Sequence, residues 1–214
     1  MTEPLAKRAH ARIIGMIFSG ELVAGDALQE AKLGEALNMS RTPVREAIKR
    51  IEAEGLAERD GRFLRVRQLS AEEVEEIFFL RETLEAHGAR MATRLPKSTL
   101  EAMKTRIHAL MQAGPGEGEE HWRVDNDFHR MLADAAGNET LIRTIDDLRL
   151  RTCIFDHTRV PQRFLKGCEE HLAIIAALES GDAEQAGELI AAHIRNARDA
   201  ILEWLTVFNE GKAP

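Results

Sequence analysis

The residues from Ser40 to Leu56 read SRTPVREAIKRIEAEGL, and this stretch indicates a short amphipathic helix. Ser40 is a favourable N-cap residue, and Gly55 is a residue type at which helices commonly end. The helix predicted over 42–54 has an apolar stripe at helical spacing, made of Val44, Ala47, Ile48 and Ile51. One face of the helix therefore packs on a core, and the opposite face is polar.

The neighbouring segments predict a small unit around this helix. A shorter amphipathic helix is expected over 30–37, and the turn Asn38-Met39 separates the two helices. Two short β candidates follow, 56–59 and 63–67, and they flank Asp60-Gly61-Arg62, an Asp-Gly signal typical of hairpins. Two helices across a tight turn, followed by a hairpin, predict a winged helix-turn-helix.

The polar face of the helix over 42–54 carries groups suited to the DNA major groove. Thr42, Arg45 and Lys49 are spaced i, i+3 and i+7, and Ser40 and Arg41 stand at the N-terminal end. Hydroxyls and backbone amides bind phosphates, and an arginine fork can pair with guanine. The predicted hairpin adds Arg59, Arg62, Arg65 and Arg67. Residue chemistry alone leaves two other interpretations open, a solvated charged face and a protein-binding module.

The charge of the chain is distributed unevenly. Its 214 residues carry 29 basic and 36 acidic side chains, a formal charge of -7, which argues against a protein that coats nucleic acid non-specifically. Residues 1–69, however, have 12 Lys and Arg against 10 Asp and Glu, a balance of +2, whereas residues 70–214 have 17 against 26, a balance of -9. We therefore expect a winged helix-turn-helix domain over 1–69 and a second domain over 70–214.

The second domain has the pattern of an all-α helical bundle, so the predicted fold class is mainly α. Ser70 and Glu73 form a capping-box pattern, which predicts a helix that starts at residue 71. Further helices follow between proline and glycine breakers, such as Pro161. The predicted ranges are 71–94, 97–112, 119–135, 139–157, 162–179 and 183–209.

Four polar side chains fall on stripes of this bundle that should face inward. They are Asp125, His129, His171 and His193. Burying them without partners is costly, whereas a divalent ion held by three neutral imidazoles and a carboxylate would satisfy them all. Zinc is the first choice for this ligand set, and nickel, manganese or iron also suit it. Taken singly, a histidine on an apolar face is more often a hydrogen-bonded core residue, so the prediction depends on the coincidence of all four.

Two further charges bear on this site. Asp127 competes for the carboxylate role, but it lies two residues from His129 and on a different helix face. Arg81 lies on the inward stripe of the first bundle helix. It either pairs with Glu85 one turn on, or it faces the metal cavity and clamps the carboxylate of a small effector.

The segment from Leu33 to Val66 resembles the DNA-binding domain of GntR-family bacterial transcription regulators, most specifically through Ser40–Leu56. The resemblance implies contacts with operator DNA from Ser40, Arg41, Thr42 and Arg45. It also implies that Gly61 and Arg62, at the tip of the wing, approach the minor groove. Two departures bear on the operator that is recognised: Ala31 stands where some members have a DNA-contacting arginine, and the wing is short.

The bundle is similar to the FCD ligand-binding domain of the FadR-like subgroup, through VDNDFHRMLADAAGN (124–138), EEHLAIIAALESGD (169–182) and AAHI (191–194). The resemblance implies a metal site on Asp125, His129, His171 and His193, and a small carboxylate effector held by Arg81. We further expect a homodimer, acting as a repressor on double-stranded operator DNA, and not an enzyme. Whether the effector releases or promotes DNA binding is left open, and activation remains the alternative to repression.

Two rival interpretations use the same residues differently. A metal-dependent hydrolase or oxygenase could use the Asp/His site, with Glu169 or Glu170 as the nearest candidates for a general base. A redox switch could form from Cys153 and Cys168, although their surroundings are apolar rather than basic. The presence of only two cysteines indicates the cytoplasm, and apolar runs far short of the ~20 residues of a membrane span indicate no membrane partner.

Overall fold

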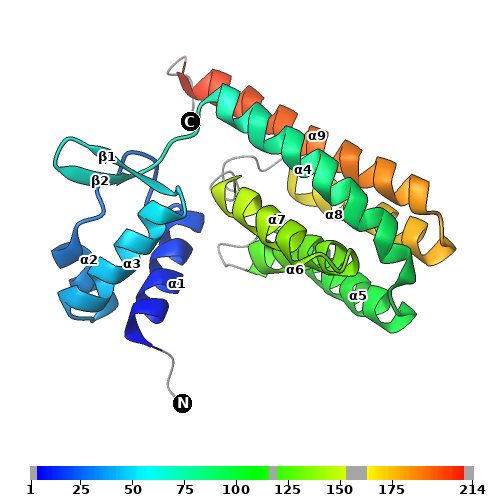
Figure 1. Cartoon of the computed structure of the whole chain (residues 1–214), viewed down its shortest axis with the longest axis horizontal. Helices are drawn as coiled ribbons and strands as arrows, with labels where there is room; N and C mark the ends of the chain where they lie inside the picture. The colour runs from blue at the N-terminus through cyan, green and yellow to red at the C-terminus, as the bar shows by residue number, and fades with distance from the viewer. Residues whose placement is uncertain (1–3, 116–119, 153–162, 210–214) are drawn as a thin grey trace. The chain divides into compact units, whose positions relative to one another are not determined.

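The computed structural model describes residues 4–115, 120–152 and 163–209. The chain forms two compact units, Met1–Leu69 and Ser70–Pro214, which are treated separately below. The described residues are mainly helical, with a single two-stranded hairpin in the first unit (Figure 1), so the predicted fold class is confirmed. None of the described helices is both long and apolar enough to cross a membrane.

The first unit is built on three helices, α1 (Leu5–Phe18), α2 (Glu30–Leu37) and α3 (Arg41–Ala53). Helix α3 begins one residue before the predicted start and ends one residue before the predicted end. Its apolar stripe faces the core, where Val44 and Ile51 are fully buried with Ile13 of α1. The helix-turn-helix therefore follows from the spacing of a few aliphatic side chains.

The turn between α2 and α3 explains how α3 starts. Asn38 adopts a left-handed conformation with φ 51° and ends α2. Ser40 lies at the N-cap of α3 with the extended backbone of such a residue, as predicted, although its hydroxyl makes no capping hydrogen bond. A capping side chain accepts from the amide of the second or third helical residue, and the third residue here is Pro43, which has no N–H. The hydroxyl of Ser40 consequently stays exposed.

The hairpin consists of β1 (Ala57–Asp60) and β2 (Phe63–Val66), with Asp60 opposite Phe63. The prediction placed Asp60 in the turn, whereas this pairing puts it in the strand and leaves a two-residue turn. Gly61 supplies the positive φ of 59° that this turn requires. The segment before α2 also lies along β2, since the Leu28 amide donates to the Leu64 carbonyl at 2.8 Å.

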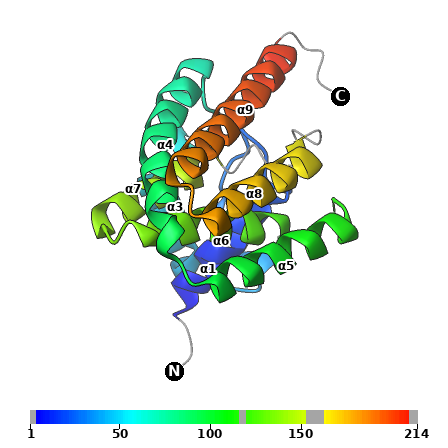
Figure 2. The same ribbon diagram turned by 90° about the vertical axis from the view of Figure 1, so that its right-hand side faces the viewer.

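The second unit is a bundle of helices, and α4 and α9 lie side by side within it (Figures 1 and 2). The Ser70–Glu73 capping box is present, with both hydrogen bonds formed. The elements are α4 (Ala71–Met91), the 3-10 turn η1 (Ala92–Arg94), α5 (Lys97–Ala113), α6 (Glu120–Ala135), α7 (Glu139–Thr152), α8 (Arg163–Ser180) and α9 (Ala183–Asn209). The predicted continuation of α7 to residue 157 and the break at Pro161 lie outside the described residues.

A glycine allows α4 and α6 to approach closely. A Cβ atom on Gly88 would lie 2.9 Å from the carbonyl oxygen of Leu132, which is closer than such contacts occur. Glu85 precedes Gly88 by almost one turn of α4, and His129 precedes Leu132 in the same way on α6. The close approach therefore brings Glu85 and His129 together.

Candidate metal centre and DNA-binding face

The four side chains predicted as metal ligands converge from three helices. Asp125 and His129 come from α6, His171 from α8 and His193 from α9, and one donor atom of each lies within 4.8 Å of all the others. The Nε2 atoms of His171 and His193 are 3.3 Å apart. Asp125 Oδ1 lies 3.8 Å from His129 Nε2 and 3.7 Å from His171 Nε2. The three histidines are buried, and the Asp125 side chain is 30% exposed.

Two buried or half-buried carboxylates orient the imidazoles. Glu85 binds Nδ1 of His129, and Glu170 binds Nδ1 of His193 at 2.8 Å. Burial by itself raises the pKa of Glu85, but Arg81 and His129 outweigh it and hold that pKa well below its usual value. The same balance, with His193 and Arg163 as the partners, lowers the pKa of Glu170 to about 2. Because ionised carboxylates only accept, each Nδ1 carries the proton and each Nε2 has its lone pair directed at the cluster.

The lone pair of His129 differs from that of His193, whose Nε2 lies within hydrogen-bond distance of Nε2 of His171. Among the described residues, the buried Nε2 atom of His129 has no hydrogen-bond partner. Burial lowers the pKa of His129 to about 4 and holds the pKa of His171 well below 6.5, so both rings are neutral at pH 7. At metal–ligand distances of about 2.0–2.1 Å, tetrahedral ligand atoms are about 3.4 Å apart, close to the separations found here. The donor set therefore fits a divalent ion with little adjustment.

Asp127 is placed away from this cluster. Its carboxylate pairs with Arg106 at 2.8 Å, and about half of its side chain is exposed. Two residues along a helix turn by about 200°, so Asp127 lies on a different face from Asp125 and His129, as predicted.

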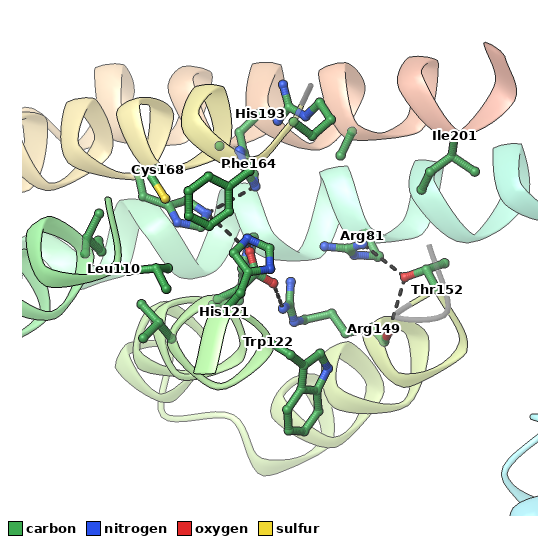
Figure 3. Close-up of a pocket in the computed structure, with 18 of the residues that line it drawn as sticks. Arg81, Leu110, His121, Trp122, Arg149, Thr152, Phe164, Cys168, His193 and Ile201 are labelled. Atoms are coloured by element: carbon green, nitrogen blue, oxygen red, sulfur yellow. Dashed lines mark hydrogen bonds and ion pairs between the residues drawn. The ribbon is translucent and has the colours of Figure 1, made fainter. Parts of the chain in front are cut away.

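A cavity of about 130 Å³ adjoins the four side chains (Figure 3). Arg81 lines it and is buried, with Nε donating to Glu85 at 2.8 Å and Nη1 donating to Thr152 Oγ1 at 3.2 Å. Arg81 thus pairs with Glu85 and also lines the cavity, and its contact with the carboxylate of an effector stays a prediction. Glu85 in turn links Arg81 to His129.

Arg149 is the cavity residue that sequence reasoning missed. It is buried on α7 and donates from Nη2 to Asp125 Oδ2 at 2.6 Å (Figure 3). The signal was available, because Arg149 continues the buried stripe of Ile142 and Ile145 at helical spacing. The same criterion that selected the histidines would have selected it.

The residues predicted to contact DNA are exposed in the first unit. They are Ser40, Arg41, Thr42, Arg45, Lys49, Gly61 and Arg62. Arg45 makes a two-bond ion pair with Glu30 of α2, with both distances 2.8 Å. Arg59 and Arg65 of the hairpin pair with carboxylates within the unit, whereas the Arg62 guanidinium lies over the Phe63 ring at 5.0 Å. At the turn of the wing, Arg62 is therefore more readily available to a ligand than those two arginines.

The rival interpretations fare poorly in the part of the chain that the structure describes. Glu170 is engaged by His193, Arg163 and Asn196, which makes it a positioning group, and Glu169 is exposed. Cys168 is buried, and burial raises the pKa of its thiol to about 11, which suits an unreactive residue. Cys153 lies outside the described residues.

Comparison with known proteins gives two family matches. Residues 5–63 match the bacterial regulatory proteins of the gntR family, and residues 76–196 match the FCD domain. The chain is 31% identical to the HTH-type transcriptional regulator LutR of Bacillus subtilis, over 87% of this chain and 96% of LutR. It is 25% identical to the HTH-type transcriptional repressor RspR of Escherichia coli, over 94% of this chain and 90% of RspR.

A solved structure shows the same fold. Escherichia coli McbR/YncC superimposes with a TM-score of 0.80 at 21% identity, covering 96% of this chain and all of that one. The families and relatives are transcription regulators rather than enzymes. The chain accordingly belongs to the GntR family of bacterial transcription regulators, with an FCD domain following its DNA-binding domain.

Proposed function

We propose that the chain is a metal-containing, effector-responsive repressor that binds operator DNA as a homodimer in the bacterial cytoplasm. Residues 1–69 would form the DNA-binding domain, and residues 70–214 the domain that binds the metal and the effector. Repression is favoured because the relative RspR is named a repressor. The observation that carries the metal assignment is the buried, unpartnered Nε2 of His129, directed at Asp125, His171 and His193.

In this proposal Asp125, His129, His171 and His193 hold the ion, with zinc as the first choice. When bound, the ion supplies a Lewis acid that attracts an anionic group into the adjoining cavity. Arg81 holds the carboxylate of the effector, because it is buried and charged and lines that cavity. Glu85 and Glu170 keep the imidazoles in the tautomer that binds metals.

On the DNA side, Thr42, Arg45 and Lys49 would face the major groove, with Ser40 and Arg41 at the phosphates. Gly61 and Arg62 would approach the minor groove. Helix α4 carries Arg81 and begins at Ala71, and only four residues separate it from the end of β2 at Val66. That short connection gives the effector site a covalent route to the wing, so effector binding would change how a dimer presents its two DNA-binding domains.

A thermal-shift screen of small organic acids on the metal-loaded protein tests this function. A ligand that binds the native state raises the melting temperature. We expect at least one acid to raise that of the wild type and to leave the His171→Ala/His193→Ala variant unchanged. Equal stabilisation of the variant, or no response to any acid, would contradict the proposal.

A further inference from the structure

Arg149 has donors to spare in a place where unused donors are costly. It is 7% exposed, and among the described residues its side chain makes one hydrogen bond, from Nη2 to Asp125. Its Nε is buried without a partner. A buried donor left unsatisfied costs about 1–3 kcal/mol, and Arg149 lines the cavity, where a ligand could supply the acceptor. Arg81, by contrast, already uses Nε and Nη1 within the protein.

The carboxylate that faces Arg149 also faces the metal site. Asp125 Oδ2 accepts from Arg149, while Oδ1 lies toward the Nε2 atoms of His129 and His171. The single negative charge of Asp125 therefore faces both the Arg149 guanidinium and the metal site. Once an ion occupies the cluster, Arg149 is the cation at the cavity whose charge is least matched.

A count of the charges around the cavity also shows a positive excess once a metal ion is bound. Arg81 and Arg149 are balanced by Glu85 and Asp125, and Arg163 is balanced by Glu170. These ion pairs leave no net charge, and a divalent ion in the cluster would add two positive charges to the balance. Buried charge of one sign is unfavourable unless it is paired. A monocarboxylate would neutralise half of this excess, and a dianion would neutralise all of it.

Size and lining restrict the dianion further. The cavity of about 130 Å³ is smaller than the roughly 300–1,000 Å³ typical of pockets for drug-sized ligands, which favours a short chain between the acid groups. Phe78, Ile107, Leu110 and Ile201 supply apolar walls for the carbon atoms between the charged ends. We infer that the effector is a short-chain diacid, and that Arg149 holds its second acid group. The inference rests on the proposed function and names the ligand class of the same site.

The test is a calorimetric titration of the metal-loaded full chain with malonate and succinate, each compared with the monoacid of equal length, propionate or butyrate. For the wild type we expect the diacid to bind at least tenfold more tightly, because a hydrogen bond to a charged group contributes about 1.5–3 kcal/mol. Arg149→Met should reduce this ratio to less than about threefold and leave monoacid binding unchanged. Arg149→Lys, which keeps the charge and loses the fork, should retain part of the preference.

Controls separate the possible failures. Arg106→Met removes an arginine from the half-exposed Arg106–Asp127 pair and should leave the ratio unchanged. If Arg149→Met fails to fold or to retain metal, the ratio measured on Arg149→Lys decides. Equal binding of diacids and monoacids to the wild type would overturn the inference and leave the proposed function standing. The same holds if an Arg149 variant that retains its metal binds neither the diacids nor the monoacids. Binding of no acid at all to the metal-loaded wild type would overturn both.

Discussion

The role of a single residue in this protein depends on which of its polar atoms have hydrogen-bond partners. His129 is the clearest case, since Glu85 takes one ring nitrogen and leaves the other directed at Asp125 with no partner of its own. Arg45 shows the reverse on the first unit, where Glu30 holds an exposed guanidinium by two hydrogen bonds. An exposed pair of this kind contributes little to stability, so DNA can compete for Arg45 at small cost.

Replacing Arg45 tests the recognition helix. We expect Arg45→Ala to cost about 1–3 kcal/mol of specific operator binding, because a guanidinium fork on guanine is lost. Gel-shift titration with operator and scrambled duplexes measures the effect. Arg8→Ala is a matched control, since it removes an exposed positive charge of α1 from the same unit. Unchanged operator affinity in Arg45→Ala would refute the assignment.

The pH dependence of alkylation at Cys168 tests the interpretation that its thiol is unreactive. With a pKa of about 11, only about one thiol in 10⁴ is ionised at pH 7, and the thiolate fraction rises about tenfold per pH unit above that. In a Cys153→Ser variant, alkylation of the folded protein should be slow and should still be accelerating above pH 9. The same variant in denaturant should react fast and level off near pH 9, where an ordinary thiol is ionised. An early plateau in the folded protein would contradict this account, and loss of DNA binding in peroxide would revive the redox switch.

At the level of helices, close packing decides where the site residues meet. The sequence predicted nearly every helix because apolar spacing, the Ser70 capping box and the proline and glycine breakers are local signals. It missed the contact between Glu85 and His129, because that contact depends on how closely α4 and α6 approach at Gly88. It also put Asp60 in the turn of the wing, since strand register depends on pairing and is not a local property.

Two of the glycines inside helices, Gly88 and Gly167, give opposite predictions for substitution by alanine. Gly88→Ala should lower the stability of the protein by about 1–3 kcal/mol, because its Cβ would meet the Leu132 carbonyl at 2.9 Å. Gly167→Ala on α8 has no described atom within 4 Å of the added Cβ and should raise stability by about 0.5–1 kcal/mol. Urea unfolding of both variants measures the two changes. Equal stability of the two variants would show that α4 and α6 are not in close contact at Gly88.

For the whole molecule, charge and histidines are divided between two compact units with separate tasks. The first unit has a balance of only +2, so non-specific DNA affinity should be weak. Specific binding would then depend on a few contacts, doubled by a second copy of the chain. The convergence of Asp125, His129, His171 and His193 could be predicted from the sequence because all four lie on apolar stripes, and metal binding there stays a prediction. The arrangement of charges around the cavity depends on several helices at once.

A homodimer should therefore need both halves of its operator. We expect the 24.0 kDa chain to sediment at twice that mass. A duplex that carries one half-site should bind far more weakly than the full operator, because the second set of contacts is lost. Equal affinity for full and half operators, measured by fluorescence anisotropy, would favour a monomer on DNA.

Metal content tests the central claim most directly. Elemental analysis of the purified wild type should find a divalent ion in stoichiometric amount, with zinc expected first, and the His171→Ala/His193→Ala variant should have lost it. His108→Ala, which removes an exposed histidine of α5, should keep the ion and serves as the control. Full occupancy in the double variant, or no divalent ion in a wild type supplied with zinc, would contradict the account.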